Sequence, residues 1–414
     1  MKTIILNQRK ERDELLSRPY LIRRNSQDAD MLLGSHLIKL ITGPRRVGKS
    51  TQALLMLRNR NFAYLNFDSQ PLLDAWDANL VMRVLDDVYP EYDYLLLDEV
   101  QNLQGWDLWV SELYRRGKNL VITGSNAKML SSEMATVLTG KYLQVEMLPF
   151  SLEEFFDWNK CDIHKLIPER QAEASVLTDD YLRNGGYPEV VAARLLTRSY
   201  LDTLFDSIVW KDVAKRHNVR NVTDLNDLAM YMLSNFCNPL SANELTEELG
   251  FSSVNTIRKF MDYLHEPYLF YYLPRYTNKL KLMKKAPRKV YVVDNGFVAA
   301  KAFSLSDNLG RLLENQVFIE LIRRGYDTDK SIFYYRSRND KEVDFVLRKG
   351  AHIERLVQVC YDMSSQKTEN REVDSLMECA QELNCSRLSI VTYCEERTIE
   401  KGGYKIDVIP ISKL

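Results

Sequence analysis

Residues 37–60 read LIKLITGPRRVGKSTQALLMLRNR, and this stretch decides the fold. An apolar, strand-like run ends at Thr42, the segment Gly43–Ser50 matches the pattern G-x-x-x-x-G-K-[ST], and a helix-like run follows. In this pattern the glycines let backbone N–H groups close around phosphates, and the N-terminus of the next helix adds positive potential. The stretch therefore predicts a phosphate-binding P-loop between a strand and a helix.

Each position of this loop has a predicted task. We expect Lys49 to neutralise the β- and γ-phosphate oxygens and the Ser50 hydroxyl to ligate Mg²⁺. The sequence thus predicts ATP and Mg²⁺ as the bound cofactors. The other expected nucleotide contacts come from the loop and the first helical turn: Gly43, Pro44, Arg45, Arg46, Val47, Gly48 and Thr51.

A second motif, YLLLDE at Tyr94–Glu99, is an apolar strand that ends in two carboxylates. Acidic residues also end strands simply because the chain enters solvent. Here the pair follows the P-loop lysine by about fifty residues, which favours a catalytic interpretation. We expect Asp98 to ligate Mg²⁺ through its water shell and Glu99 to orient and deprotonate the attacking water.

A third apolar run, LVITGSN at Leu120–Asn126, ends in small polar residues. It predicts that Ser125 binds the nucleotide and that Asn126 acts beside the γ-phosphate and its water. An ordinary turn at a strand end is the alternative interpretation.

The order of apolar runs predicts an α/β fold with several domains. Between residues 37 and 145, strand-like runs alternate with helix-like ones, which is typical of a parallel sheet with helices on both faces. We expect this P-loop domain over residues 1–150, a helical lid or linker over 151–220, a winged helix-turn-helix over 221–300 and a small α/β domain over 301–414.

Composition limits the classes of protein that fit. With 414 residues, 45% hydrophobic and 27% charged, the chain can form several cores and is too apolar to be disordered. It contains no apolar run long enough to span a bilayer and no signal peptide, so a cytoplasmic location with no membrane partner is expected. The six cysteines form no C-x-x-C pair, which predicts reduced, packed thiols.

These motifs resemble those of the prokaryotic AAA-14 ATPases, which are similar to the AAA and STAND groups and usually carry a C-terminal DUF4143 domain. The resemblance rests on LDEVQ, GW, TGSNA, LTGK and LPFSLEEF in the first half and covers nearly the whole chain. In the second half the blocks similar to DUF4143 are Trp210–Arg220, Lys289–Phe297, Gly310–Tyr326 and Glu342–Leu347.

The resemblance implies further roles. The loop Gly185–Pro188 is similar to the lid motif of STAND ATPases, which implies that Pro188 contacts the nucleotide, although the loop can also simply turn the chain. Lys141 stands where the family often has arginine. If this position acts on a neighbouring subunit of a homo-oligomer, lysine lacks the bidentate geometry of an arginine finger.

Residues 241–264 have helix-turn-helix spacing, with Leu245, Leu249, Ile257, Phe260, Met261 and Leu264 facing inward. The second helix carries outward-facing basic residues, and the loop downstream of it carries basic residues and no acid, which favours phosphate contacts. Because the net charge of the chain is only −1, such a local patch is required for DNA binding. The predicted DNA contacts are Arg258, Lys259, Lys279, Lys281, Lys284 and Lys285, beside Arg275, Arg288 and Lys289 in the same loop. A protein-binding module with a solvated basic loop is the alternative.

In the last domain, Glu314, Asp344 and Gln358 resemble the PD-(D/E)xK nuclease arrangement of a helix carboxylate, a strand aspartate and E-x-K on the next strand. Here E-x-K reads Gln358-Val359-Cys360. Glutamine is a weaker metal ligand and cysteine cannot replace the ammonium, so the sequence predicts a nuclease-like fold with little or no cutting. Alternatively, Glu314 and Asp344 cap helices or pair with Arg336 and Arg338.

Three functions remain open from the sequence. They are a DNA-associated ATPase switch, an ATP-gated metal-dependent nuclease, and a signalling ATPase whose winged helix binds protein. The basic patch favours the first, and Gln358-Val359-Cys360 disfavours the second.

Overall fold

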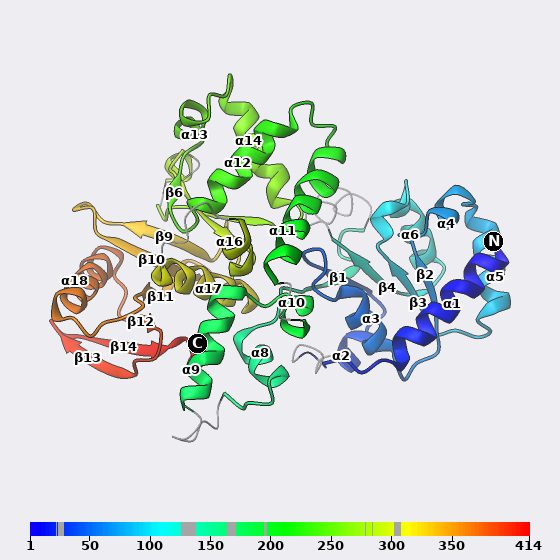
Figure 1. Ribbon diagram of the computed structural model, residues 1–414, viewed down its shortest axis with the longest axis horizontal. Coiled ribbons are helices and arrows are strands. Elements are labelled where there is room, and N and C mark those ends of the chain that lie inside the picture. The colour runs from blue at the N-terminus through cyan, green and yellow to red at the C-terminus, as the bar shows by residue number, and fades with distance from the viewer. Residues whose placement is uncertain are drawn as a thin grey trace. The chain divides into compact units, whose positions relative to one another are not determined.

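The computed structural model describes residues 1–21, 23, 29–125, 138–163, 171–193, 197–277, 279–283, 285–301 and 308–414, without the side chain of Leu280. The chain divides into two compact units (Figure 1). The first comprises Met1–Leu148 with Glu266–Tyr268, and the second comprises Pro149–His265 with Leu269–Leu414.

The first unit is built on a parallel sheet with the strand order β2-β3-β4-β1-β5. Each strand lies in a predicted apolar run, so this part of the prediction is confirmed. The strand β4, with the third motif, lies between the P-loop strand β1 and the strand β3 that carries the acidic pair. The bounds are β1 Ile38–Thr42, β2 Phe62–Asn66, β3 Tyr94–Asp98, β4 Asn119–Gly124 and β5 Tyr142–Glu146.

Both faces of this sheet are covered, because every residue of β1 is buried and successive side chains point to opposite faces. One face packs Leu40, Leu97 and Ile122 with apolar residues of α5 and α6 in a single core. On α5, Asp77 caps the N-terminus by accepting from the Leu80 N–H. The helices of this unit are α1 Lys2–Ser17, α2 Ala29–Gly34, α3 Lys49–Leu57, α4 Gln70–Asp74, α5 Ala78–Val88, the short η2 Val100–Asn102 and α6 Trp106–Arg115.

The N-terminal helix α1 was not predicted from the sequence, because its first residues were interpreted only as a segment that does not match a signal peptide. It buries Ile5 in the core of the sheet. Gln8 forms two hydrogen bonds with the backbone of Asn66, and Arg12 donates to the Phe62 carbonyl. The helix therefore covers the exposed edge next to β2.

The second unit begins with helices. Ser151 and Glu154 form a capping box that fixes the start of α8. Further along, a π-helical segment continues α11. The bounds are α8 Leu152–Trp158, α9 Gln171–Asn184, α10 Pro188–Ala192, α11 Thr197–Ser207, the π-helical η6 Ile208–Lys215 and α12 Val222–Ser234.

A small antiparallel sheet with the order β6-β8-β7 follows, together with two helices. Gly250 takes a positive φ of 68° between these helices, and Ile257, Phe260, Met261 and Leu264 are buried as expected, with Leu249 half-buried. The bounds are β6 Pro239–Leu240, α13 Ala242–Glu248, α14 Val254–His265, β7 Phe270–Leu273, α15 Leu280–Met283, β8 Arg288–Val292 and α16 Asn295–Lys301.

The chain ends in a mixed sheet with the order β13-β14-β12-β11-β10-β9. Apolar residues of α18, such as Leu376, pack on one face of it. The bounds are α17 Leu309–Arg323, β9 Ile332–Arg336, β10 Glu342–Lys349, β11 His352–Val359, α18 Gln366–Leu383, β12 Leu388–Thr392, β13 Arg397–Lys401, β14 Tyr404–Pro410 and η7 Ile411–Lys413.

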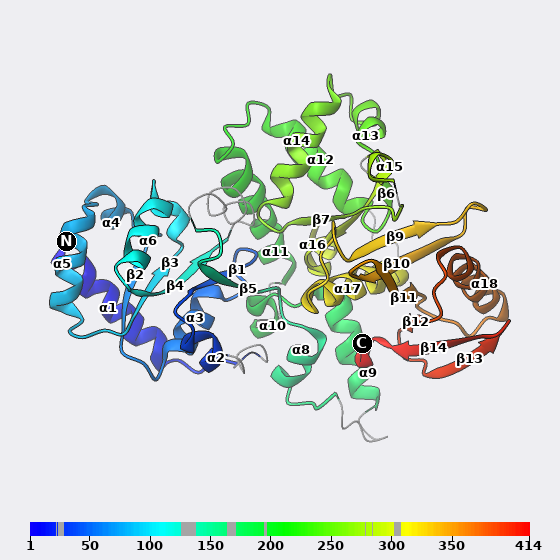
Figure 2. The same ribbon diagram turned by 180° about the vertical axis from the view of Figure 1, so that it is seen from behind.

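The small sheet and the C-terminal sheet are joined inside the second unit. Figure 2 shows β7 beside β9, where the Tyr276 N–H donates to the Tyr334 carbonyl at 2.7 Å and the Tyr334 N–H donates to the Pro274 carbonyl at 3.1 Å. The Tyr334 hydroxyl also donates to the Pro287 carbonyl at 2.7 Å. The basic loop that follows the first strand of the predicted wing is thus fastened at both ends to the edge of the larger sheet.

In the described part of the chain, no helix is both long and apolar enough to cross a membrane. All six cysteines are free, and only Cys394 is exposed.

Candidate nucleotide site and C-terminal carboxylate cluster

The P-loop backbone has the conformation that phosphate binding requires. A Cβ on Gly43 would lie 2.0 Å from the Met147 carbonyl oxygen, so only glycine fits at this close approach. Arg46 and Gly48 take positive φ values of 68° and 90°, and Gly48 is the N-cap of α3. Alternating conformations of this kind turn successive N–H groups toward one point, which makes an anion-binding nest at the helix N-terminus.

The lysine of the loop is buried and points toward the acidic pair. The Lys49 ammonium donates to the Pro44 carbonyl at 2.8 Å and lies 3.8 Å from the Glu99 carboxylate. Its side chain is only 3% exposed, whereas that of Glu99 is 19% exposed. A buried ammonium at the N-terminus of α3, beside the phosphate-binding loop, is well placed to bind phosphate oxygens.

Asp98 is the most closely bonded acid of the site. It accepts hydrogen bonds from the Thr123 hydroxyl at 2.5 Å and the Tyr64 hydroxyl at 3.2 Å, and a further one from Ser50. Burial and, to a smaller extent, the charge of Glu99 raise the pKa of Asp98 to about 6, against the lowering effect of the three hydroxyl groups. Ser50 and Asp98, the two predicted metal ligands, are therefore in direct contact.

Glu99 is held in an uncommon backbone conformation. Its φ of 50° and ψ of 45° lie in the left-handed region, which non-glycine residues adopt mainly where surrounding contacts enforce it. Its N–H donates to the Thr123 hydroxyl oxygen at 2.9 Å. The Gln101 amide and, at 3.4 Å, the Ser125 hydroxyl both donate to its carboxylate. The carboxylate is thus oriented by donors from two segments of the chain, η2 and the end of β4.

Sequence reasoning missed Thr123, Gln101 and Tyr64. Thr123 bridges Asp98 and Glu99 through one hydroxyl, and Gln101 also donates to Ser125 at 3.2 Å. The signal for Thr123 was its position at the end of a buried strand, but only the pairing of β3 with β4 reveals what it faces. Arg23, also missed, donates to the carbonyls of Leu148 at 2.9 Å and Val47 at 3.4 Å, and so supports the P-loop.

The remaining predicted residues are placed as follows. Val47 is fully buried, Arg46 is exposed, and Arg45 and Thr51 are half-buried. Ser125 lies beside Glu99, whereas Asn126 lies outside the described residues. Pro188 begins α10 in the second unit.

The Gly185–Pro188 loop is fixed by a buried acid. The Asp294 carboxylate accepts from the Gly186 N–H at 2.7 Å and the Gly296 N–H at 2.8 Å. A Cβ on Gly185 would lie 1.7 Å from that carboxylate. Burial raises the pKa of Asp294 to about 7, while the two N–H groups lower it.

The predicted DNA-binding cations divide into two groups. Arg258 and Lys259 on α14 are exposed, as are Lys279, Lys281 and Lys285 around α15, and Lys284 lies outside the described residues. Lys289 is different, because it is buried and 2% exposed. The prediction that Lys289 belongs to the phosphate-contacting basic group was wrong, because a buried ammonium cannot contact a phosphate backbone.

The three nuclease-like positions lie on the predicted elements, with Glu314 on α17, Asp344 on β10 and Gln358 on β11. The alternative interpretation, in which Glu314 and Asp344 pair with Arg336 and Arg338, was wrong. Lys289 instead lies 3.0 Å from Glu314 and 2.9 Å from Asp344. Arg336 pairs with Glu342 and Asp340.

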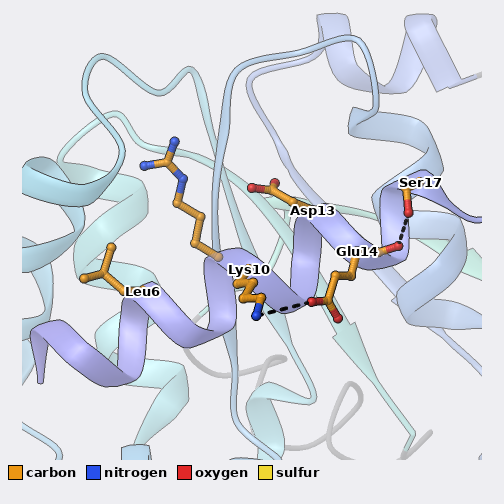
Figure 3. A pocket seen from close by; sticks show the side chains of 6 residues that line it. Leu6, Lys10, Asp13, Glu14 and Ser17 are labelled. Atoms are coloured by element: carbon orange, nitrogen blue, oxygen red, sulfur yellow. Dashed lines mark hydrogen bonds and ion pairs between the residues drawn. The ribbon is translucent and has the colours of Figure 1, made fainter.

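A separate open hollow of about 460 Å³ lies along α1 (Figure 3). Its charged side chains bond one another, as in the pair of Lys10 and Glu14 at 3.9 Å. It includes no P-loop residue and so lies apart from the nucleotide site. The lining residues are Leu6, Arg9, Lys10, Asp13, Glu14 and Ser17.

The fold and the P-loop geometry define a P-loop protein with an AAA domain. The AAA-14 model, described as an AAA domain, matches residues 35–156, and two domains of unknown function, DUF8612 and DUF4143, match 176–308 and 309–414. The chain belongs to the AAA-14 P-loop ATPases with a C-terminal DUF4143 domain. The blocks Trp210–Arg220 and Lys289–Phe297 fall in the DUF8612 match, which corrects their assignment to DUF4143.

Two relatives match over most of their length. An uncharacterised protein of Methanocaldococcus jannaschii is 31% identical over 94% of this chain and 90% of its own. An uncharacterised protein of Haemophilus influenzae is 34% identical over 82% of this chain and 86% of its own. The Walker-type ATPase paby2304 of Pyrococcus abyssi is similar with 15% identity and a TM-score of 0.42, covering 69% of this chain and 99% of that structure.

Proposed function

We propose that this protein binds ATP with Mg²⁺ and hydrolyses it as a molecular switch of the AAA and STAND type that acts on or near DNA. The observation that carries the proposal is the convergence of four side chains from distant segments. Lys49 and Ser50 at the start of α3 meet Asp98 and Glu99 at the end of β3.

The donor set fits Mg²⁺. This ion prefers hard oxygen ligands, and the Ser50 hydroxyl and the Asp98 carboxylate are already in hydrogen-bond contact. These two residues would hold the ion, directly or through its waters. When bound, Mg²⁺ neutralises charge on the phosphates.

The protein groups then have distinct roles in hydrolysis. The P-loop N–H groups and the Lys49 ammonium bind the phosphate oxygens, and the Glu99 carboxylate accepts a proton from the water that attacks the γ-phosphate. Gln101 and Ser125 hold that carboxylate in place. We assign contacts with the γ-phosphate side to Asn126 and a lid contact to Pro188. Loss of the phosphate would release both and so change the state of the switch.

Mg²⁺-dependent ATP hydrolysis by the full chain tests this assignment. Glu99→Gln is expected to retain ATP binding and to lose hydrolysis by at least about a hundredfold, because the proton acceptor is gone. Lys49→Ala is expected to weaken binding itself. Glu112→Gln, on the exposed surface of α6, is the matched control and should hydrolyse ATP at the wild-type rate. Unchanged turnover in Glu99→Gln would refute the role of this carboxylate.

The DNA part of the proposal is supported by the exposed cations. Arg258 and Lys259 project from the second helix of a helix pair, and Lys279, Lys281 and Lys285 surround α15. We interpret α12–β8 as a winged helix whose cations contact phosphates. Hydrolysis measured with and without duplex DNA tests this interpretation. Stimulation that is lost in Arg258→Ala with Lys259→Ala supports it, whereas indifference to DNA favours a switch whose winged helix binds protein.

A further inference from the structure

Three carboxylates converge on one buried ammonium in the second unit. The Lys289 Nζ atom, supplied by β8, lies 3.0 Å from Glu314 Oε1, 2.8 Å from Glu342 Oε1 and 2.9 Å from Asp344 Oδ1. Glu314 lies on α17, and the other two acids lie on β10. The lysine comes from the small sheet and the acids come from the nuclease-like domain, so the cluster joins two parts of the chain.

Further polar atoms of the cluster have protein partners. The Tyr291 hydroxyl donates to Glu314 Oε1 at 2.8 Å, and the Val359 N–H donates to Asp344 Oδ2 at 2.9 Å. Gln358 is engaged at both ends of its amide, which accepts from the Asp344 N–H at 3.3 Å and donates to Glu372 at 2.9 Å. Gln358, which stands where active nucleases of this type have a metal-binding acid, therefore orients Asp344 and Glu372.

The charge balance explains why a cation is needed at this place. Buried carboxylates are costly unless a cation and hydrogen bonds compensate them. Burial by itself would lower the pKa of Lys289, but Asp344, Glu314 and Glu342 together raise it well above its ordinary value. The lysine is consequently charged at neutral pH and supplies one positive charge to the three carboxylates, while burial raises the pKa of Glu314 to about 7 and so reduces the negative charge to be compensated.

The distances correspond to an ammonium and differ from those of a metal. An ammonium has three N–H donors, which match the three oxygens at 2.8–3.0 Å, whereas Mg²⁺ requires oxygens at about 2.0–2.1 Å. Within the described ranges, no group of three or more His, Cys, Asp or Glu side chains is arranged to hold a metal ion. We propose that Lys289 occupies this cluster in place of a divalent cation, which closes the nuclease-like centre and fastens the small sheet to the C-terminal domain.

Neighbouring contacts hold Lys289 in register. The Asn315 side chain accepts from the Val292 N–H and donates to the Val292 carbonyl, both at 2.9 Å. On β8, Tyr291 stacks on Phe318 of α17 with ring centroids 4.0 Å apart. The strand that delivers the ammonium is thereby fixed against the helix that carries Glu314.

Binding of Mn²⁺ by the full chain without nucleotide tests the proposal independently of ATP hydrolysis. The wild type is expected to show no Mn²⁺ uptake that depends on Asp344 and no Mn²⁺-dependent nicking of supercoiled plasmid. Lys289→Met leaves the carboxylates without their cation, so its melting temperature should fall and added Mn²⁺ should raise it again. Its Mn²⁺ affinity should exceed that of the wild type by at least about tenfold.

Two controls make the result specific. Lys285→Met removes an exposed lysine near β8 and should melt as the wild type does. Lys289→Met with Glu314→Gln and Asp344→Asn removes the ammonium and two of its counter-charges, so it should fold even if Lys289→Met alone does not, and it should ignore Mn²⁺. Uptake or nicking by the wild type that is lost in Asp344→Asn would overturn the proposal. A folded Lys289→Met chain that is indifferent to Mn²⁺, or a triple variant that does not fold, would also overturn it.

Discussion

Thr123 offers the sharpest test of how the nucleotide site is assembled. Its side chain is fully buried at the end of β4. Its hydroxyl donates to Asp98 at 2.5 Å and accepts from the Glu99 N–H at 2.9 Å. Thr123→Val keeps the branched shape and removes both hydrogen bonds, so the variant isolates the contribution of this one oxygen atom.

The expected loss of stability follows from these two bonds. A hydrogen bond to a charged group contributes about 1.5–3 kcal/mol, and a buried N–H without a partner costs about 1–3 kcal/mol. The added methyl group offsets about 0.8 kcal/mol of this loss. The free energy of unfolding of the first unit is therefore expected to fall by about 2–5 kcal/mol in Thr123→Val.

Urea denaturation measures this loss, followed by the fluorescence of Trp106 and Trp109, which lie in the core of the first unit. Thr123→Ser retains the hydroxyl and loses only a methyl group, so it should lose about 1 kcal/mol. ATP hydrolysis should fall at least about tenfold in Thr123→Val, because small displacements of Asp98 and Glu99 are costly to catalysis. Equal denaturation midpoints for the valine and serine variants would refute the bridging role of Thr123.

Two further predictions concern groups that the structure holds in place. Gln101→Ala removes a donor to Glu99, so the turnover number should fall about tenfold or more while the affinity for ATP, measured by titration, stays unchanged; a change in affinity alone would contradict this role. Asp294 should make stability depend on pH, because its pKa is about 7 in the folded chain and near 4 when unfolded. The folded state then binds the extra proton between these values, so the free energy of unfolding should fall as pH rises from about 4 to 7. Denaturation midpoints of Asp294→Asn should fall less steeply over this range, and parallel curves would exclude Asp294 as the source.

The strands and the P-loop were predictable because their signals are local. Apolar runs such as Tyr94–Asp98 are short, contiguous and bounded by polar residues, and the loop at Gly43–Ser50 needs specific residue types at fixed spacing. The helix α1 has no such signal. It packs through few buried residues, including Ile5 and Gln8, so its role depends on the sheet edge that it covers.

The supporting residues of the site could not be predicted for a physical reason. Thr123 and Glu99 are 24 positions apart in the chain and meet only because β3 and β4 pair in parallel. Gln101 faces the carboxylate because Glu99 adopts the left-handed conformation and turns the chain into η2. Neither the strand pairing nor the positive φ of a glutamate can be read from residue spacing.

Basic residues that are close together in the sequence can also have opposite roles, which a count of charges cannot separate. Lys285 and Lys289 are close in sequence, yet the first is exposed and the second compensates buried acids. If the exposed group binds duplex DNA, each phosphate contact should contribute about −0.9 to the slope of log K against log salt. Lys281→Ala should therefore make that slope shallower by about 0.9, because an exposed cation and its released counterion are lost. An internal change at Lys289 should leave the slope unaltered even where it lowers stability. If substitution of Lys289 changes the slope of log K against log salt and substitution of Lys281 does not, then Lys289 is the exposed DNA contact and the reasoning from burial is refuted.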